Sequence, residues 1–204
     1  MRNPLHWGCE TQRPPAHRVQ GAHRVTDDQR RLLPVQPDTR SPTLVIICGL
    51  PGSGKTTHAR SLEEEMPAVR FCPDEWMQAL RISLHDEVRR DDIEQLQWTL
   101  ARRLLELGQS VLIEWGTWGR SERDRLRQEA RGIGARVELH YLTAPTDVLF
   151  DRVQRRGMEE VPITRQEVDA WEALIDIPAQ DEMMLFDDVL TATFVDETPD
   201  GRTT

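Results

Sequence analysis

Short apolar runs alternate with segments of helical spacing along most of the chain. The run at 44–48 is continuous and rich in β-branched residues, which is typical of a strand buried on both faces. Further strands are expected at 69–72, 111–115, 137–142 and 192–195. Helices are expected at 56–65, 73–80, 91–107, 121–130, 145–156, 164–174 and 181–186. This alternation predicts an α/β fold, with a parallel sheet and helices on both of its faces.

The helix expected at 91–107 has the most regular apolar spacing in the chain. Its predicted core face comprises Ile93, Leu96, Leu100, Leu104 and Leu107. Gly108 follows as the expected C-cap, and Ser121 and Thr164 are the expected N-caps of two later helices.

Residues 1–42 differ from the rest of the chain. They hold six of the 13 prolines, carry a net charge of +3 and lack helical or strand periodicity. This composition predicts a disordered tail rich in Arg and Pro, followed by one domain over 43–204. A transit segment and a misassigned start codon are alternative interpretations of the tail.

Composition and charge narrow the class of protein. The chain has 204 residues and a net charge of −9, and an acidic chain is poorly suited to broad, non-specific binding of nucleic acid. No apolar run approaches the roughly 18 residues of a membrane span, and no secretory signal is expected. Cys9, Cys48 and Cys72 are too few for a disulfide framework, so we expect a cytoplasmic protein without a membrane partner.

A phosphate-binding pattern follows the first expected strand. The pattern G-x-x-x-x-G-K-[ST] is matched by Gly49, Leu50, Pro51, Gly52, Ser53, Gly54, Lys55 and Thr56, and Thr57 follows directly. Its glycines let successive backbone N–H groups point at phosphate oxygens, and the next helix presents its N-terminus to the same anion. Lys55, the only lysine beside 25 arginines, is expected to reach the β- and γ-phosphates, and Thr56 to offer its hydroxyl to Mg²⁺.

Two carboxylates follow the next expected strands, at the sheet edge where ligands of such folds bind. Asp74 is a candidate general base for an acceptor hydroxyl, or it merely favours the N-terminus of a helix. Glu114 ends an apolar strand and is a candidate for the Mg²⁺ shell, or it is a buried structural carboxylate. Trp115 and Trp118 lie next to it in the sequence and are candidates for the wall of an acceptor pocket.

Arginines provide candidates for stabilising transferred phosphate. Arg123 lies near the start of an expected helix, while Arg127 is expected on a solvated face. Arg152 and Arg156 are four residues apart on one helix, before a lid-like segment at 157–163. We expect Arg123, Arg152 or Arg156 to neutralise charge on the phosphoryl group.

Together these residues resemble the predicted-kinase branch of AAA-annotated P-loop ATPases, over roughly residues 43–196. That branch is akin to the kinase half of polynucleotide kinases, to zeta toxins and to chloramphenicol phosphotransferase. The resemblance rests on 49–57, on 73–76, on 114–123, on the helix with Arg152 and Arg156, and on 178–187.

The resemblance implies a three-layer P-loop NTPase sandwich with a five-stranded parallel sheet of order 2-3-1-4-5. It also implies the use of ATP and Mg²⁺, with Asp74 in the position of the base. Two positions depart from the pattern: Glu114 stands where Asp is usual, and Gly157 follows Arg156 where the branch often has Asn.

The expected function is therefore that of an ATP-dependent kinase acting on a hydroxyl of a small molecule. A nucleotide-binding regulator or NTPase switch without kinase activity is one alternative, and a polynucleotide 5′-hydroxyl kinase is another. Motifs of this kind do not specify the acceptor, because substrate choice depends on the shape of the pocket.

Overall fold

The protein is built around a parallel sheet, seen in a computed structural model that describes residues 41–157 and 162–193. The sheet has five strands in the order β2-β3-β1-β4-β5, which confirms the expected fold class and strand order. The strands are β1 (Thr43–Cys48), β2 (Ala68–Phe71), β3 (Ser110–Ile113), β4 (Arg136–Thr143) and β5 (Asp188–Thr193). Residues 1–40, which make up most of the predicted tail, lie outside the described residues.

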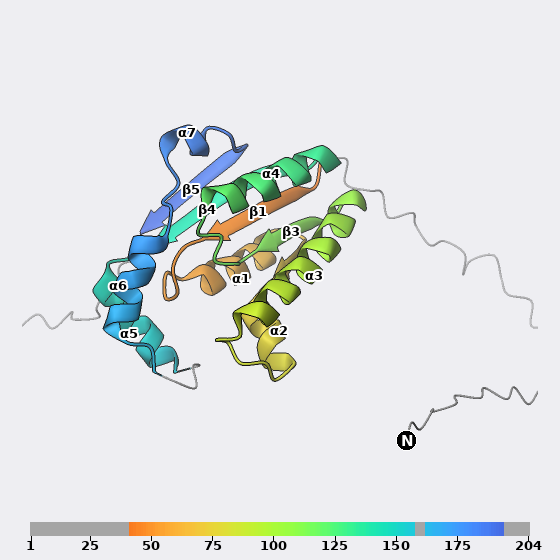
Figure 1. Ribbon diagram of the computed structural model, residues 1–204. Coiled ribbons are helices and arrows are strands. Elements are labelled where there is room, and N and C mark those ends of the chain that lie inside the picture. The colour runs from red at the N-terminus through yellow and green to blue at the C-terminus, as the bar shows by residue number, and fades with distance from the viewer. Residues whose placement is uncertain (1–40, 158–161, 194–204) are drawn as a thin grey trace, which may run out of the picture. The chain divides into compact units, whose positions relative to one another are not determined.

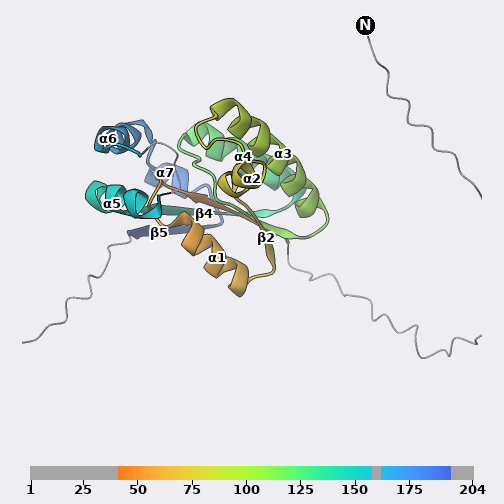
Figure 2. The same ribbon diagram turned by 90° about the horizontal axis from the view of Figure 1, so that it is seen from below.

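Helices cover both faces of the sheet (Figures 1 and 2). Seen from below, α1 lies on one face, and α3 and α4 lie on the other (Figure 2). The helices are α1 (Lys55–Glu65), α2 (Pro73–Ala79), α3 (Glu87–Glu106), α4 (Arg120–Ile133), α5 (Thr146–Arg156), α6 (Arg165–Leu174) and α7 (Gln180–Met183). This layered arrangement is the one that buries both faces of a parallel sheet.

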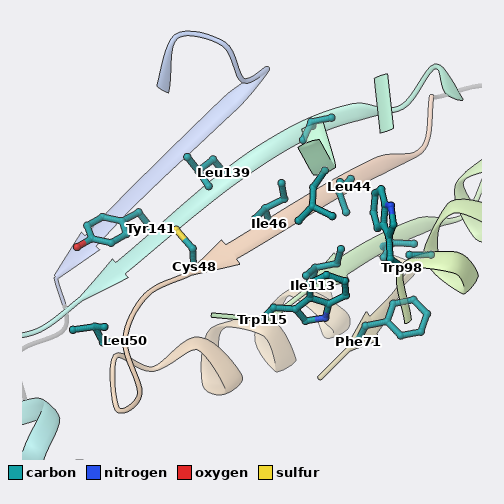
Figure 3. Packing of buried hydrophobic residues seen from close by; sticks show 14 of the residues in the cluster. Leu44, Ile46, Cys48, Leu50, Phe71, Trp98, Ile113, Trp115, Leu139 and Tyr141 are labelled. Carbon is teal, nitrogen blue, oxygen red and sulfur yellow. The ribbon is translucent and has the colours of Figure 1, made fainter. Parts of the chain in front are cut away.

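The central strand β1 supplies both halves of the core. Its alternate residues Leu44 and Ile46 pack on the side of α3 and α4, together with large side chains such as Trp98 (Figure 3). Val45 and Ile47 point to the opposite face and pack with α1. All four side chains are fully buried, as the continuous apolar run at 44–48 predicts.

The core face of α3 differs from the predicted one. Leu96, Leu100 and Leu107 are 52%, 42% and 66% exposed. The buried residues of this helix are Ile93, Gln97, Trp98, Ala101 and Leu105. Leucines occur all around α3, so their spacing alone does not select one face. The small Ala101 and the broad Trp98 allow the helix to pack closely on the sheet and on α4.

The ends of helices and strands match the sequence-based predictions at some positions and differ at others. Thr164 caps α6 through a complete capping box with Glu167, as predicted. The predicted N-cap Ser121 is wrong, because α4 starts at Arg120 and its N-cap is Gly119. The last strand also begins earlier than expected, at Asp188, because it follows the register of β4.

Candidate active site

A cavity of about 1310 Å³ lies where β1, β2 and β3 end. It brings together part of the phosphate loop, Trp118 and six of the charged or hydroxyl side chains singled out in the sequence. These six are Lys55, Thr56, Asp74, Glu114, Arg152 and Arg156. They come from segments far apart in the chain, and parallel strands deliver them to one edge of the sheet.

The phosphate loop curls tightly between β1 and α1. Gly49 and Gly52 have φ angles of +147° and +83°, which favour glycine. A Cβ at Gly49 would lie 2.2 Å from the carbonyl oxygen of Leu142, and one at Gly52 would lie 2.7 Å from that of Leu149. The close approach of β4 and α5 therefore requires glycine at both positions.

Lys55 is the first residue of α1, and its ammonium group turns back over the loop. Its Nζ donates hydrogen bonds to the carbonyl oxygens of Gly49 (2.9 Å) and Leu50 (3.1 Å). Burial lowers the pKa of Lys55, while the charges of Asp74 and Glu114 act against this shift. The lysine thus lies in the cavity wall, bonded to the loop and subject to the charges of two carboxylates.

Thr56 and Glu114 form a pair of hard oxygen donors beside the loop. The Thr56 hydroxyl donates to Oε1 of Glu114 over 2.8 Å, and the Glu114 side chain is 2% exposed. A hydroxyl and a carboxylate are suitable ligands for Mg²⁺, either directly or through water. In the part of the chain that the structure describes, no three His, Cys, Asp or Glu side chains form a metal cluster. This donor set fits a Mg²⁺ ion that takes its remaining ligands from phosphates and water.

Asp74 lies at the start of α2, on the wall of the cavity. Its Oδ1 accepts a hydrogen bond from Nη1 of Arg90 over 2.8 Å, and Arg90 also donates to the carbonyl oxygen of Leu84. Arg90 lines the same cavity and was not identified from the sequence. Arg90 stands just before the helix expected at 91–107, and its neighbours in the sequence give no signal of such a pairing.

Arg152 and Arg156 approach the loop from α5. Nη1 of Arg152 donates to the carbonyl oxygen of Gly52 over 3.2 Å. The positive charge of Arg156 adds to the lowering of the Lys55 pKa, which reflects the proximity of these two cations. The structure thus brings both arginines to the side of the cavity that holds the phosphate loop.

Arg123 differs from its prediction, since its guanidinium is fully buried away from the cavity lining. It pairs with Glu182 through two hydrogen bonds of 2.7 and 2.9 Å. It also donates to the carbonyl oxygens of Thr117, Trp118 and Asp176. With its donors used inside the protein, Arg123 has no path to a phosphoryl group in this arrangement.

Two more aromatic and basic side chains depart from expectation. Arg127 is buried rather than solvated, and its guanidinium lies 5.7 Å from the ring centre of Phe186. Trp118 lines the cavity, but Trp115 is in the core and donates its indole N–H to Gln97. Of the two candidate tryptophans, only Trp118 lines the cavity.

The part of the cavity lined by α2, α3 and α4 carries five carboxylates beside the single cation Arg90. Its carboxylates are Asp74, Glu87, Asp91, Glu94 and Glu122. Burial and then the charge of Glu122 raise the pKa of Glu94 to about 7, which indicates that these acids lie close together. This half of the cavity is unfavourable for an anionic molecule.

Arg70, on β2, is a further residue that the motifs missed. It donates to Glu63, Glu75 and Glu114, each over 2.8 Å, and its side chain is only 10% exposed. A charged residue within a predicted strand is the signal that could have identified it, because such residues are seldom buried without partners.

No helix in residues 41–157 and 162–193 has both the length and the apolar character to cross a bilayer.

The comparison with curated proteins finds no match. Among solved structures, a protein of Chloroflexus aurantiacus j-10-fl, named as a kinase without a stated substrate, shares 20% identity with a TM-score of 0.60. The match covers 76% of this chain and 89% of that one.

Two other solved structures have the same fold. Kti12 of Chaetomium thermophilum, in complex with ADP-AlF3, shares 19% identity over 76% of this chain and 90% of that one, with a TM-score of 0.57. A gluconokinase from Sinorhizobium meliloti 1021 shares 18% identity over 76% and 83%, with a TM-score of 0.50. The family model described as an AAA domain matches residues 44–178. Since that match spans well over half of the sequence, and the phosphate loop and sheet order agree with it, the chain belongs to the AAA domain family of P-loop proteins.

Proposed function

We propose that this protein is an ATP-dependent phosphotransferase that moves the γ-phosphoryl group of ATP to a hydroxyl of a small molecule. One observation carries the proposal: the phosphate loop, the Thr56–Glu114 pair and the carboxylate of Asp74 line a single cavity. Such a cavity can hold a triphosphate and an acceptor side by side, which is the main requirement of phosphoryl transfer.

In this proposal each part of the cavity has one task. Backbone N–H groups of the loop over residues 49–57 and Lys55 bind the phosphates. Thr56 and Glu114 would hold Mg²⁺, which when bound neutralises phosphate charge. Arg152 and Arg156 stabilise the charge that develops on the transferred group.

Asp74 acts on the acceptor. The acceptor oxygen forms a bond to the γ-phosphorus as the bond to the β,γ-bridging oxygen breaks, and ADP leaves. The hydroxyl proton passes to the carboxylate of Asp74. Oδ1 is hydrogen-bonded to Arg90, so Oδ2 is the atom left to receive this proton.

The acidic half of the cavity supports a small acceptor that is neutral or cationic. A polynucleotide end would bring phosphates against Glu87 and Asp91, where like charges repel. We therefore rank the polynucleotide 5′-kinase below the small-molecule kinase. Labelling of an oligonucleotide end that weakens steeply with salt would reverse this order.

A nucleotide-binding regulator remains the second candidate, and the Asp74–Arg90 pair is the observation that favours it. A carboxylate bound to a guanidinium of another helix ties α2 to α3, which suits a structural role. The two functions differ in what Asp74 does once ATP and an acceptor are both bound.

The test is transfer of label from γ-labelled ATP to a panel of alcohols sorted by charge: sugars, amino alcohols, antibiotics, nucleosides and sugar acids. We expect labelling of a neutral or cationic member. Lys55→Ala should remove it, and Asp74→Asn should lower kcat at least about 100-fold while ATP binding persists. Asp92→Asn is the matched control, because Asp92 is 59% exposed on α3 and, within the described residues, pairs only with Arg89.

Label that reaches water alone, with Asp74→Asn unchanged, would support the regulator or switch instead. Label that still reaches the acceptor in Lys55→Ala would contradict the role of the loop.

A further inference from the structure

One guanidinium, that of Arg70, binds carboxylates from α1, from α2 and from the residue that follows β3. Its Nε donates to Glu63 of α1 and its Nη2 to both oxygens of Glu75 of α2, each over 2.8 Å. Its Nη1 donates to Oε2 of Glu114, also over 2.8 Å. The planar fork of arginine is suited to such multiple contacts, whereas a lysine ammonium would act as a point charge.

Glu114 is fixed through both of its oxygens. Oε2 accepts from Arg70, and Oε1 accepts from the hydroxyl of Thr56. The Glu114 side chain is 2% exposed, so solvent contributes little to its orientation. The hydrogen bond from Arg70 to Oε2 therefore fixes the orientation of the carboxylate plane. Oε1 is left directed at Thr56, beside the phosphate loop.

The position of Arg70 in the sheet makes this arrangement stiff. It lies on edge strand β2 and pairs in register with Leu112 of β3, two residues before Glu114. The backbone N–H of Glu114 itself donates to the carbonyl oxygen of Phe71, next to Arg70. The two side chains thus emerge from adjacent hydrogen-bonded strands.

We infer that Arg70 is a positioning residue that holds Glu114 in the orientation needed to support Mg²⁺ beside the phosphate loop. The inference rests on the proposed function and extends it, because the Mg²⁺ site is part of that proposal. Arg70 does not line the cavity and acts only through Glu114. Residues that orient metal ligands in this way typically contribute about 10- to 100-fold in metal affinity or activity.

Two other roles for Arg70 predict different results. If Arg70 only clamps α1 and α2 to the sheet, its loss should weaken nucleotide binding with and without Mg²⁺ alike. If Arg70 only adds positive charge, its loss should make the site more negative. Mg²⁺ should then increase the affinity for ATP by a larger factor than in the wild type. If Arg70 positions Glu114, its loss should reduce the gain in ATP affinity due to Mg²⁺. The affinity for ATP without Mg²⁺ should stay unchanged.

The experiment is calorimetric titration of the full chain with ATP, once in EDTA and once with Mg²⁺. The ratio of the two Kd values is the gain in affinity due to Mg²⁺. For Arg70→Gln we expect the Kd in EDTA to stay at the wild-type value and the gain to fall about tenfold or more. Arg70→Lys keeps the charge but not the planar fork, and it replaces Arg70→Gln in the experiment if that variant does not fold. We expect it to reduce the gain in affinity due to Mg²⁺ as well.

Arg60→Gln is the matched control. Arg60 also contacts Glu75, over 3.1 Å, but its side chain is 63% exposed and no contact with Glu114 is found for it among the described residues. It should leave both Kd values unchanged. Circular dichroism and thermal unfolding verify that each variant is folded.

An unchanged or increased gain in folded Arg70→Gln would overturn the inference, as would equal weakening of ATP binding in EDTA and in Mg²⁺. Failure of the proposed function looks different, because then the wild-type protein itself binds no ATP or gains no affinity from Mg²⁺.

Discussion

At the scale of single residues, a pair of histidines links α1 to β4, and one of them, His58, lines the cavity. Nε2 of His58 lies 2.8 Å from Nδ1 of His140, so one ring donates and the other accepts. Burial and then the charge of His58 lower the pKa of His140 to about 4, and burial also lowers the pKa of His58. The folded protein therefore favours the neutral form of this pair.

This pair predicts a loss of stability in mild acid. Unfolded His140 takes up a proton below about pH 6.5, whereas the folded form resists until about pH 4. The unfolded state binds more protons in this window, so stability falls as pH falls, by about 2 kcal/mol for His140 between pH 7 and pH 5.

Urea unfolding at these two pH values measures the effect. His140→Gln, which keeps a hydrogen-bonding group but cannot titrate, should remove most of this loss. His85→Gln, at an exposed loop position, should leave it intact. An equal loss in wild type and His140→Gln would contradict the prediction.

At the scale of elements, Arg123 joins α4 to the chain segments around α7. Its side chain and that of Glu182 are 0% and 1% exposed, and Arg123 also binds three backbone carbonyl oxygens. The pair lies behind the cavity wall that includes Trp118. Its task is to hold the elements that shape the cavity.

Removing one partner should therefore cost stability. We expect Arg123→Met to lose about 3–5 kcal/mol, since it leaves Glu182 as an uncompensated buried charge. The double variant Arg123→Met/Glu182→Leu should recover part of this loss. Arg125→Met, on the same helix but 49% exposed, should cost less than about 1 kcal/mol. Urea denaturation compares all three, and an Arg123→Met protein as stable as wild type would rule out this role.

At the scale of the whole molecule, the phosphate loop is where several elements meet. Gly49 lies against the backbone of β4 and Gly52 against that of α5, while Lys55 opens α1. Because the loop connects the central strand to the layers around it, a ligand bound there stabilises the folded domain as a unit.

Binding of Mg·ATP should thus raise the thermal stability of the protein. At a concentration of about 100 times Kd, a ligand specific for the folded state adds about 2.7 kcal/mol. For a domain of this size that corresponds to a rise in Tm of several degrees. Differential scanning fluorimetry with millimolar Mg·ATP measures it, with Lys55→Ala as the variant that should lose the shift. No shift in the wild-type protein would argue against a nucleotide site.

Local features of this protein could be read from the sequence because they depend on neighbouring residues. The phosphate loop is one contiguous segment in which glycines permit the turns and Lys55 stands in a fixed place, so its pattern determines its geometry. The buried run of β1 and the capping box at Thr164 are equally local. The strand order could be expected only through the resemblance to other P-loop proteins.

The tertiary structure decided which distant side chains meet. Arg70 and Glu114 are 44 residues apart, and Arg123 and Glu182 are 59 apart, so no spacing rule links them. The buried face of α3 is determined by packing, because leucines on several sides make the periodicity ambiguous. Packing also buries Arg123 away from the cavity. Sequence alone specified the phosphate loop, because backbone conformation is a local property. Partner choice among charged side chains belongs to the fold, because a buried charge is tolerated only where another element supplies its counterion.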